Sequence, residues 1–104
     1  MSFPLTGDGF ESGVVTENGL KEPSRFKVYL HNDDYTTMEF VVEILMQVFH
    51  RTEAQATAIM LAIHHEGLGL CGVYPAEIAE TKVDIVHRLA RKDGFPLRCS
   101  MEEE

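Results

Sequence analysis

Two helix-start signals follow one another in the middle of the chain, and they limit the folds that it can adopt. Thr36 with Glu39, and Thr52 with Gln55, have the spacing of capping boxes, in which two side chains satisfy free backbone N–H groups. Each box is followed by apolar residues at helical spacing, which are Val41, Ile44, Leu45 and Val48, and then Ala56, Ile59, Met60 and Ile63. We therefore predict one helix from Met38 to about Phe49 and a second helix that Gly67 ends.

Strand-like segments lie on both sides of this helical pair. Residues 26–31 alternate between apolar and other side chains, and residues 69–74 place an apolar run between glycines. Helical spacing predicts a third helix over 76–92, followed by a strand over 96–101 and a solvated acidic tail over 102–104. The order strand, helix, helix, strand, helix, strand predicts an α+β fold, with the helices packed on one face of a small, mostly antiparallel sheet.

The N-terminal segment differs from the rest of the chain in its composition. Residues 1–24 are rich in Gly, Ser, Thr and Asn, and their apolar residues keep neither a strand nor a helix period. Pro23 and Ser24 mark the end of this segment. We expect a flexible N-terminal arm over residues 1–24 and one folded domain over residues 25–104.

Charge and composition exclude several classes of protein. The net charge of -8 would repel phosphate backbones, so nucleic acid is not expected as a partner. No apolar run reaches the roughly 20 residues that span a bilayer, and the first residues do not resemble a secretory signal, so we expect a cytoplasmic protein that does not bind membranes. Cys71 and Cys99 stand among apolar or small residues and are interpreted as reduced thiols in the core.

A polar cluster lies where the first strand gives way to the first helix. Asn32, Asp33 and Asp34 occupy this connection, and side chains on loops held by a rigid scaffold often bind ligands. The same residue types also build turns by local hydrogen bonding, so a purely structural role is equally consistent with the sequence. His64, four residues after Met60, lies on the same helical stripe as that methionine, and either a structural or a binding role fits it.

Metal-dependent or nucleophilic chemistry has weaker support. The chain has five His and two Cys, but none of the familiar spacings of zinc or calcium sites is present. The two cysteines fall in predicted strands, and the glycines at 67, 69 and 72 run from a helix into a strand, the reverse of a dinucleotide loop. We therefore expect neither a catalytic site, nor a bound metal, nor a cofactor.

The polar cluster belongs to a longer series of motifs that resembles one family. The motifs are Asn32-Asp33-Asp34-Tyr35-Thr36, Met38-Glu39-Phe40-Val41, Ile59-Met60-Leu61, His64, Cys71-Gly72-Val73 and Ala79-Glu80-Thr81-Lys82. In order and spacing, from about Phe26 to Glu102, they resemble ClpS, the bacterial N-end-rule adaptor of the Clp protease system. Thr37 departs from the pattern, because the family usually has proline there.

The resemblance implies a fold, a function and roles for particular residues. Three helices would pack on a three-stranded antiparallel sheet, and the protein would be an adaptor, not an enzyme. It would bind proteins with N-terminal Phe, Tyr, Trp or Leu and deliver them to the N-terminal domain of the ClpA unfoldase, which feeds the ClpP peptidase. Asn32, Asp33 and His64 would hold the substrate's α-amino group, with Asp34 supporting the loop. The residues of an apolar pocket would be Thr36, Met38, Val41, Met60, Ile63 and Leu97. Contact with the unfoldase would be made by Glu77 and Lys82.

Elementary chemistry agrees with such a binding site. An α-ammonium group has three donors, which an amide oxygen, a carboxylate and a neutral imidazole nitrogen can accept. Burial of a Leu or Phe side chain adds about 1.5 to 3 kcal/mol. Two other functions remain open at this point: a metal-assisted hydrolase that uses Asp33, Asp34 and His64, and a regulator that binds the unfoldase without recognising substrates.

Overall fold

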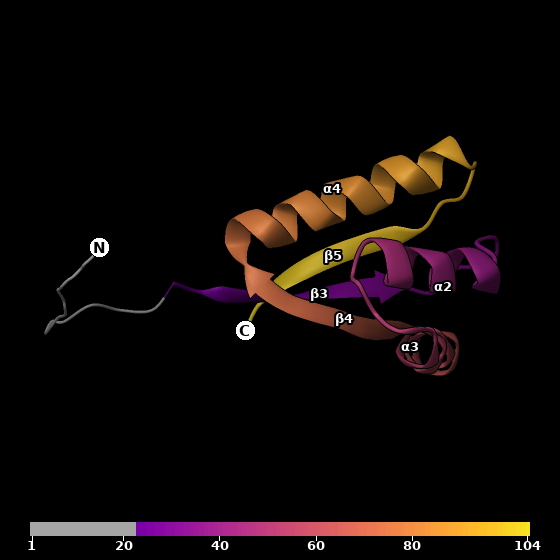
Figure 1. Ribbon diagram of the computed structural model, residues 1–104. Coiled ribbons are helices and arrows are strands. Elements are labelled where there is room, and N and C mark those ends of the chain that lie inside the picture. Colours follow the sequence, from indigo (N-terminus) through magenta and orange to yellow (C-terminus); the bar gives the residue numbers. More distant parts are fainter. Residues whose placement is uncertain (1–22) are drawn as a thin grey trace, which may run out of the picture.

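The computed structural model describes residues 23–104, so the arm expected over residues 1–24 lies almost wholly outside the described residues. The described chain contains β3 (Arg25–His31), α2 (Met38–Gln47), α3 (Glu53–Glu66), β4 (Leu68–Pro75), α4 (Ala76–Lys92) and β5 (Arg98–Glu103). This order of strands and helices is the predicted one (Figure 1). The α+β fold is therefore confirmed.

The three described strands form one antiparallel sheet in the order β4-β3-β5, with β3 in the centre. The pairing of β3 with β4 shifts by one residue between Val28, opposite Gly72, and Tyr29, opposite Leu70, which leaves Cys71 as an extra residue. Arg51 donates two hydrogen bonds to the carbonyl oxygen of Cys71, from Nε at 2.9 Å and from Nη2 at 2.6 Å. The connection between α2 and α3 is thereby fastened to β4 at its irregular point.

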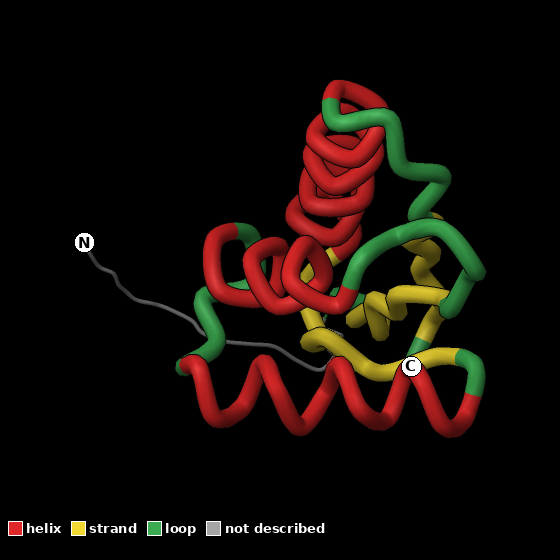
Figure 2. The backbone as a smooth tube through the Cα atoms, turned by 90° about the vertical axis from the view of Figure 1, so that its right-hand side faces the viewer, coloured by secondary structure: helices red, strands yellow, loops and turns green. Residues whose placement is uncertain are grey.

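The helices bury one face of the sheet (Figure 2). Val28 and Leu30 of β3 are fully buried in one cluster with side chains of α2, α3 and α4, whereas the alternate residues Lys27, Tyr29 and His31 are only half-buried. Because successive strand side chains point to opposite faces, this pattern shows that the core lies on one side of the sheet. Cys71 and Cys99 belong to that cluster and are free thiols, as predicted.

Local signals explain most of the helix boundaries. The capping box predicted at Thr52 and Gln55 is present, with both reciprocal hydrogen bonds formed. Gly67 ends α3 with a φ of 92°, in the left-handed region that glycine adopts without a steric penalty. Helix α4 has the predicted bounds.

The capping box predicted at Thr36 is wrong. Thr37 is the N-cap of α2, and its side chain accepts a hydrogen bond from the backbone N–H of Phe40. The hydroxyl of Thr36 instead donates to Asp33, which lies in the preceding loop. The residue at which the family usually has proline therefore starts the helix here by a different means, through side-chain capping.

The bounds of two other elements, α2 and β5, differ from the prediction by about two residues. Helix α2 ends at Gln47 rather than near Phe49, although Val48 and Phe49 remain buried. The last strand covers Arg98–Glu103 rather than residues 96–101, because Glu102 and Glu103 pair with β3 and the N–H of Glu104 donates to the carbonyl of Arg25. The acidic end of the chain is thus partly a strand, although its side chains are exposed.

Candidate functional site

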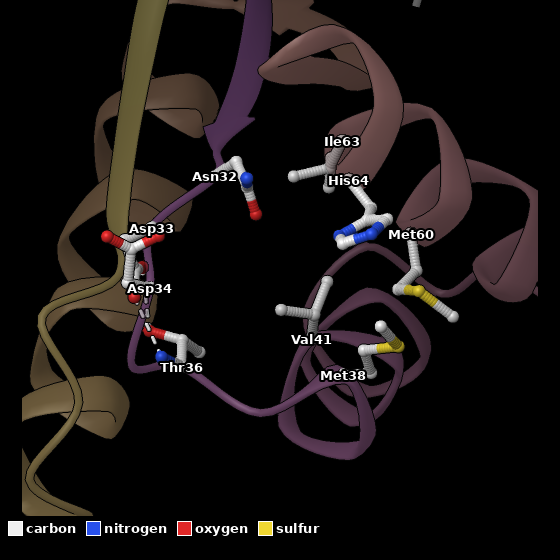
Figure 3. Close-up of a pocket in the computed structure, with 9 residues that line it drawn as sticks. All are labelled: Asn32, Asp33, Asp34, Thr36, Met38, Val41, Met60, Ile63 and His64. Carbon is white, nitrogen blue, oxygen red and sulfur yellow. Dashed lines mark hydrogen bonds between the residues drawn. The ribbon is translucent and has the colours of Figure 1, made fainter.

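A cavity of about 270 Å³ opens between the loop after β3, the first turns of α2 and the second half of α3. Its lining consists of Asn32, Asp33, Asp34, Thr36, Met38, Val41, Met60, Ile63 and His64 (Figure 3). The structure therefore brings together all but one of the residues that the sequence analysis placed in a substrate site. They come from two segments, residues 32–41 and 60–64, with 18 residues of chain between them.

The loop that carries the polar residues is held by Asp33. One carboxylate oxygen, Oδ1, accepts hydrogen bonds from the N–H groups of Tyr35 at 2.8 Å and of Thr36 at 2.7 Å. The other, Oδ2, accepts from the hydroxyl of Thr36 at 2.8 Å. The loop is also attached to the end of α3, since the N–H of Asn32 donates to the carbonyl of Gly67 at 2.8 Å. Asp33 is therefore a turn-building residue, and it lines the cavity as well.

These contacts determine the charge on Asp33. Partial burial raises the pKa of the Asp33 carboxyl, but hydrogen bonds from Thr36 and Tyr35, together with the nearby positive charge of Arg91, outweigh that effect and lower the pKa below its ordinary value. The carboxylate is consequently ionised at neutral pH. Asp33 thus presents a fixed negative charge at the wall of the cavity.

Two further polar side chains reach the same space. Figure 3 shows the amide of Asn32 and the imidazole of His64 pointing toward the middle of the cavity, one from the loop and one from α3. Both residues are exposed, and the ring of His64 lies edge-on to that of His65 with centroids 5.3 Å apart. An amide oxygen and a neutral imidazole can each accept a hydrogen bond, so this side of the cavity suits a donor with a positive charge.

The opposite wall is apolar. Val41 and Ile63 are 6% and 3% exposed and form its inner part, whereas Met38 is 49% exposed and stands at the mouth. Met60, one turn of α3 before His64, completes this wall. The cavity therefore combines acceptors on one side with a hydrocarbon and thioether surface on the other, and both can contact one small amphipathic ligand.

Leu97 does not line this cavity, contrary to the expectation from the resemblance. Its side chain is 1% exposed and belongs to the buried core, next in sequence to the start of β5. The carbonyl of Leu97 accepts a hydrogen bond from Arg91 at 2.9 Å, which holds the connection from α4 to β5. Leu97 is thus a core residue, and it is not among the residues that line the cavity.

The two residues expected to contact the unfoldase lie on α4, away from the cavity lining. Glu77 is exposed in the first turn of the helix. Lys82 is half-buried, and its Nζ donates to the carbonyl of Val48 at 2.7 Å and lies 5.1 Å from the ring centroid of Tyr74 and 5.8 Å from that of Phe49. Lys82 therefore has a structural role at the end of α2, which the sequence analysis missed.

Other kinds of chemistry find little support in the described structure. Within residues 23–104, no three His, Cys, Asp or Glu side chains are grouped so that they could hold a metal ion. Burial raises the pKa of the Cys99 thiol to about 12 and raises that of Cys71 as well, so both stay protonated at neutral pH and lack the thiolate that a nucleophile needs. No helix of the described residues is long and apolar enough to cross a membrane.

Comparison with known proteins decides the family. Residues 21–100 match the model of the family described as ATP-dependent Clp protease adaptor protein ClpS. This chain belongs to the ClpS family. The resemblance found in the motifs is thereby confirmed, and the family name describes an adaptor of the Clp protease rather than a catalytic enzyme.

Curated ClpS proteins match almost the whole chain. The ClpS adapter of Nitratidesulfovibrio vulgaris (strain DP4) is 59% identical over 103 residues, which is 99% of each chain. That of Shewanella piezotolerans is 61% identical over 87 residues, covering 84% of this chain and 85% of that one. Among solved structures, Agrobacterium tumefaciens ClpS2 bound to L-phenylalaninamide has a TM-score of 0.77 and 38% identity, and covers 80% of this chain and 100% of its own.

Proposed function

We propose that this ClpS protein recognises the free N-terminus of substrate proteins that begin with Phe, Tyr, Trp or Leu, and delivers them to the ClpA unfoldase. The observation that carries the proposal is the two-sided cavity, with Asn32, Asp33 and His64 facing an apolar wall. A chain that begins with a large apolar residue has an ammonium group and a hydrocarbon side chain on the same carbon atom. It can therefore satisfy both walls at once.

The ammonium group accounts for the selection of a chain end. Internal residues have no cationic group on the backbone, whereas a free N-terminus offers three donors to the acceptors of the loop and of α3. Asp33 is ionised and already ordered by three hydrogen bonds, so little further ordering of that side chain is needed when the ligand binds. Hydrogen bonds that involve a charged group contribute about 1.5 to 3 kcal/mol each.

The apolar wall accounts for the preference for large side chains. Met38, Val41, Met60 and Ile63 supply a surface without hydrogen-bonding demands, and burying a Leu or Phe side chain against such a surface contributes about 1.5 to 3 kcal/mol. The related protein bound to L-phenylalaninamide supports this assignment, because that ligand combines a free amino group with a benzyl side chain. After the cost of immobilising the ligand, a moderate and releasable affinity is expected, which suits an adaptor.

Delivery would use the surface of α4 and the N-terminal residues. Glu77 is exposed there and available to the N-terminal domain of ClpA, and Lys82, which is partly exposed, lies on the same helix. Among the described residues, those that line the cavity all lie between Asn32 and His64. Deletion of residues 2–24 should therefore leave peptide affinity unchanged while lowering ClpA- and ClpP-dependent degradation of a reporter with N-terminal Phe.

The decisive experiment is a titration with labelled peptides that differ only at the N-terminus. A peptide with a free N-terminal Phe should bind, and its acetylated form should not, because acetylation removes the charge and two of the donors. Equal binding of the two forms would contradict recognition of the ammonium group. Binding of neither form, together with binding to ClpA, would favour a regulator that does not recognise substrates.

A further inference from the structure

A second hollow lies beside the cavity described above and shares two of its residues. It has a volume of about 330 Å³ and lies between α2 and α3, lined by Met38, Glu39, Val42, Glu53, Thr57 and Met60. Met38 and Met60 therefore form a wall that is common to both hollows. A ligand whose first side chain packs on one side of this wall can place a later part of its chain on the other side.

The second hollow has its own chemical character. Val42, Met38 and Met60 supply apolar surface, while Glu39 and Glu53 contribute exposed carboxylates from the first turns of α2 and α3. Neither carboxylate takes part in an ion pair with any residue from 23 to 104. An apolar surface bordered by acidic groups matches a side chain with a hydrocarbon stem and a cationic head, which is the structure of lysine and arginine.

We propose that this second hollow holds a basic side chain of the substrate, from one of the residues that directly follow its N-terminal residue. The inference rests on the proposed function, because it takes the N-terminal residue to occupy the first cavity. An extended chain advances about 3.3 Å per residue and directs successive side chains to opposite sides. One position among residues 2 to 4 should therefore reach the hollow better than its neighbours.

Glu39 and Glu53 also lie where negative charge favours a helix N-terminus, so their presence alone does not demonstrate a ligand site. The proposal differs from that role in what it predicts. A carboxylate that only stabilises its helix affects all N-terminal Phe peptides alike, whereas one that contacts a basic side chain affects the ratio of affinities between charged and neutral peptides.

The test uses the full chain and peptides with a free N-terminal Phe that carry either Lys or Met at position 2, 3 or 4. Met is the neutral comparison because its stem resembles that of Lys. At low ionic strength and at one of the three positions, the Lys peptide should bind about 3- to 10-fold more tightly than the Met peptide. The preference should decrease as salt screens the charges.

Substitutions then locate the source of this preference. Glu39→Gln and Glu53→Gln should each reduce the ratio of Lys to Met affinity by about 2- to 4-fold, with little effect on the Met peptide. Glu43→Gln is the matched control, since Glu43 is exposed on α2 but lines a different hollow. It removes the same charge from the acidic surface and should leave the ratio unchanged. Because each ratio is measured on a single variant, a partial loss of folding does not affect it.

Two results would overturn the proposal in distinguishable ways. If the Met peptides bind but Lys is preferred at none of the three positions, or if Glu43→Gln reduces the ratio as much as the other two substitutions, the second hollow is not a site for basic side chains. The first cavity would keep its assignment in that case. If no peptide with a free N-terminal Phe binds, the proposed function itself fails, and this inference fails with it.

Discussion

Replacement of the Asp33 carboxylate separates its two roles in the structure. Asp33→Asn keeps a carbonyl oxygen that can accept from the N–H groups of Tyr35 and Thr36, and its amide can meet the hydroxyl of Thr36, so the loop should be preserved. Asp33→Ala removes all three hydrogen bonds together with the charge. A comparison of the two variants therefore distinguishes the charge from the turn.

The magnitudes follow from the hydrogen bonds. Loss of the charge changes a hydrogen bond of about 1.5 to 3 kcal/mol into one of about 0.5 to 1.5 kcal/mol, so Asp33→Asn should raise the Kd for an N-terminal Phe peptide about tenfold. Because Asp33 is only half-buried, water replaces part of what Asp33→Ala removes, and we expect a loss of about 1 to 2 kcal/mol in the free energy of unfolding. For a domain of this size, that loss lowers Tm by roughly 5 to 15 °C.

Peptide titration and thermal denaturation of the three proteins supply the assay. Asp34→Asn is the control, since Asp34 is exposed at the same cavity and none of the hydrogen bonds that hold the loop involves its side chain. It should weaken binding less than Asp33→Asn does. The reasoning is refuted if Asp33→Asn binds the free Phe peptide as tightly as the parent protein, or if Asp33→Ala melts at the parent temperature.

Three further predictions concern other parts of the molecule. Burial, together with nearby arginines, lowers the pKa of His31 and of His87, whose Nε2 accepts from the N–H of Cys99. Both groups favour the neutral form when folded, so the free energy of unfolding should fall as the pH drops below about 6.5. His87→Gln should reduce that fall, as measured by urea titrations at several pH values. Lys82→Met should lower the free energy of unfolding by about 1 to 2 kcal/mol, because the hydrogen bond of Lys82 to the carbonyl of Val48 and its contacts with Phe49 and Tyr74 are lost. Substitution of the exposed Glu77 by Gln should change that free energy by less than about 0.5 kcal/mol. Equal stability of the two variants would show that Lys82 has no structural role. A Cβ at Gly69 would lie 2.7 Å from Cγ1 of Ile63, which lines the cavity. Gly69→Ala should therefore lower the free energy of unfolding by about 1 to 3 kcal/mol and weaken peptide binding by displacing Ile63. Unchanged denaturation and binding curves would contradict this packing argument.

The sequence alone determined the order and type of the secondary-structure elements. The signals are local: the capping box at Thr52, the glycine at position 67 and the spacing of apolar residues each act within about four residues of chain. The same locality caused the error at α2. Thr36 and Thr37 both can cap a helix, and Asp33 decided between them by accepting the hydroxyl of Thr36. A competition between neighbouring side chains of this kind is not visible in the spacing.

The motifs also identified every residue of the cavity lining, through the resemblance rather than through geometry. Which side chains meet when they are far apart in sequence depended instead on tertiary packing. Leu97 entered the core instead of the pocket, Lys82 found an acceptor 34 residues away, and Arg91 came close enough to lower the pKa of Asp33. The second hollow likewise exists only because α2 and α3 pack side by side. Such contacts depend on how whole elements pack together, and no local pattern of residues encodes that arrangement.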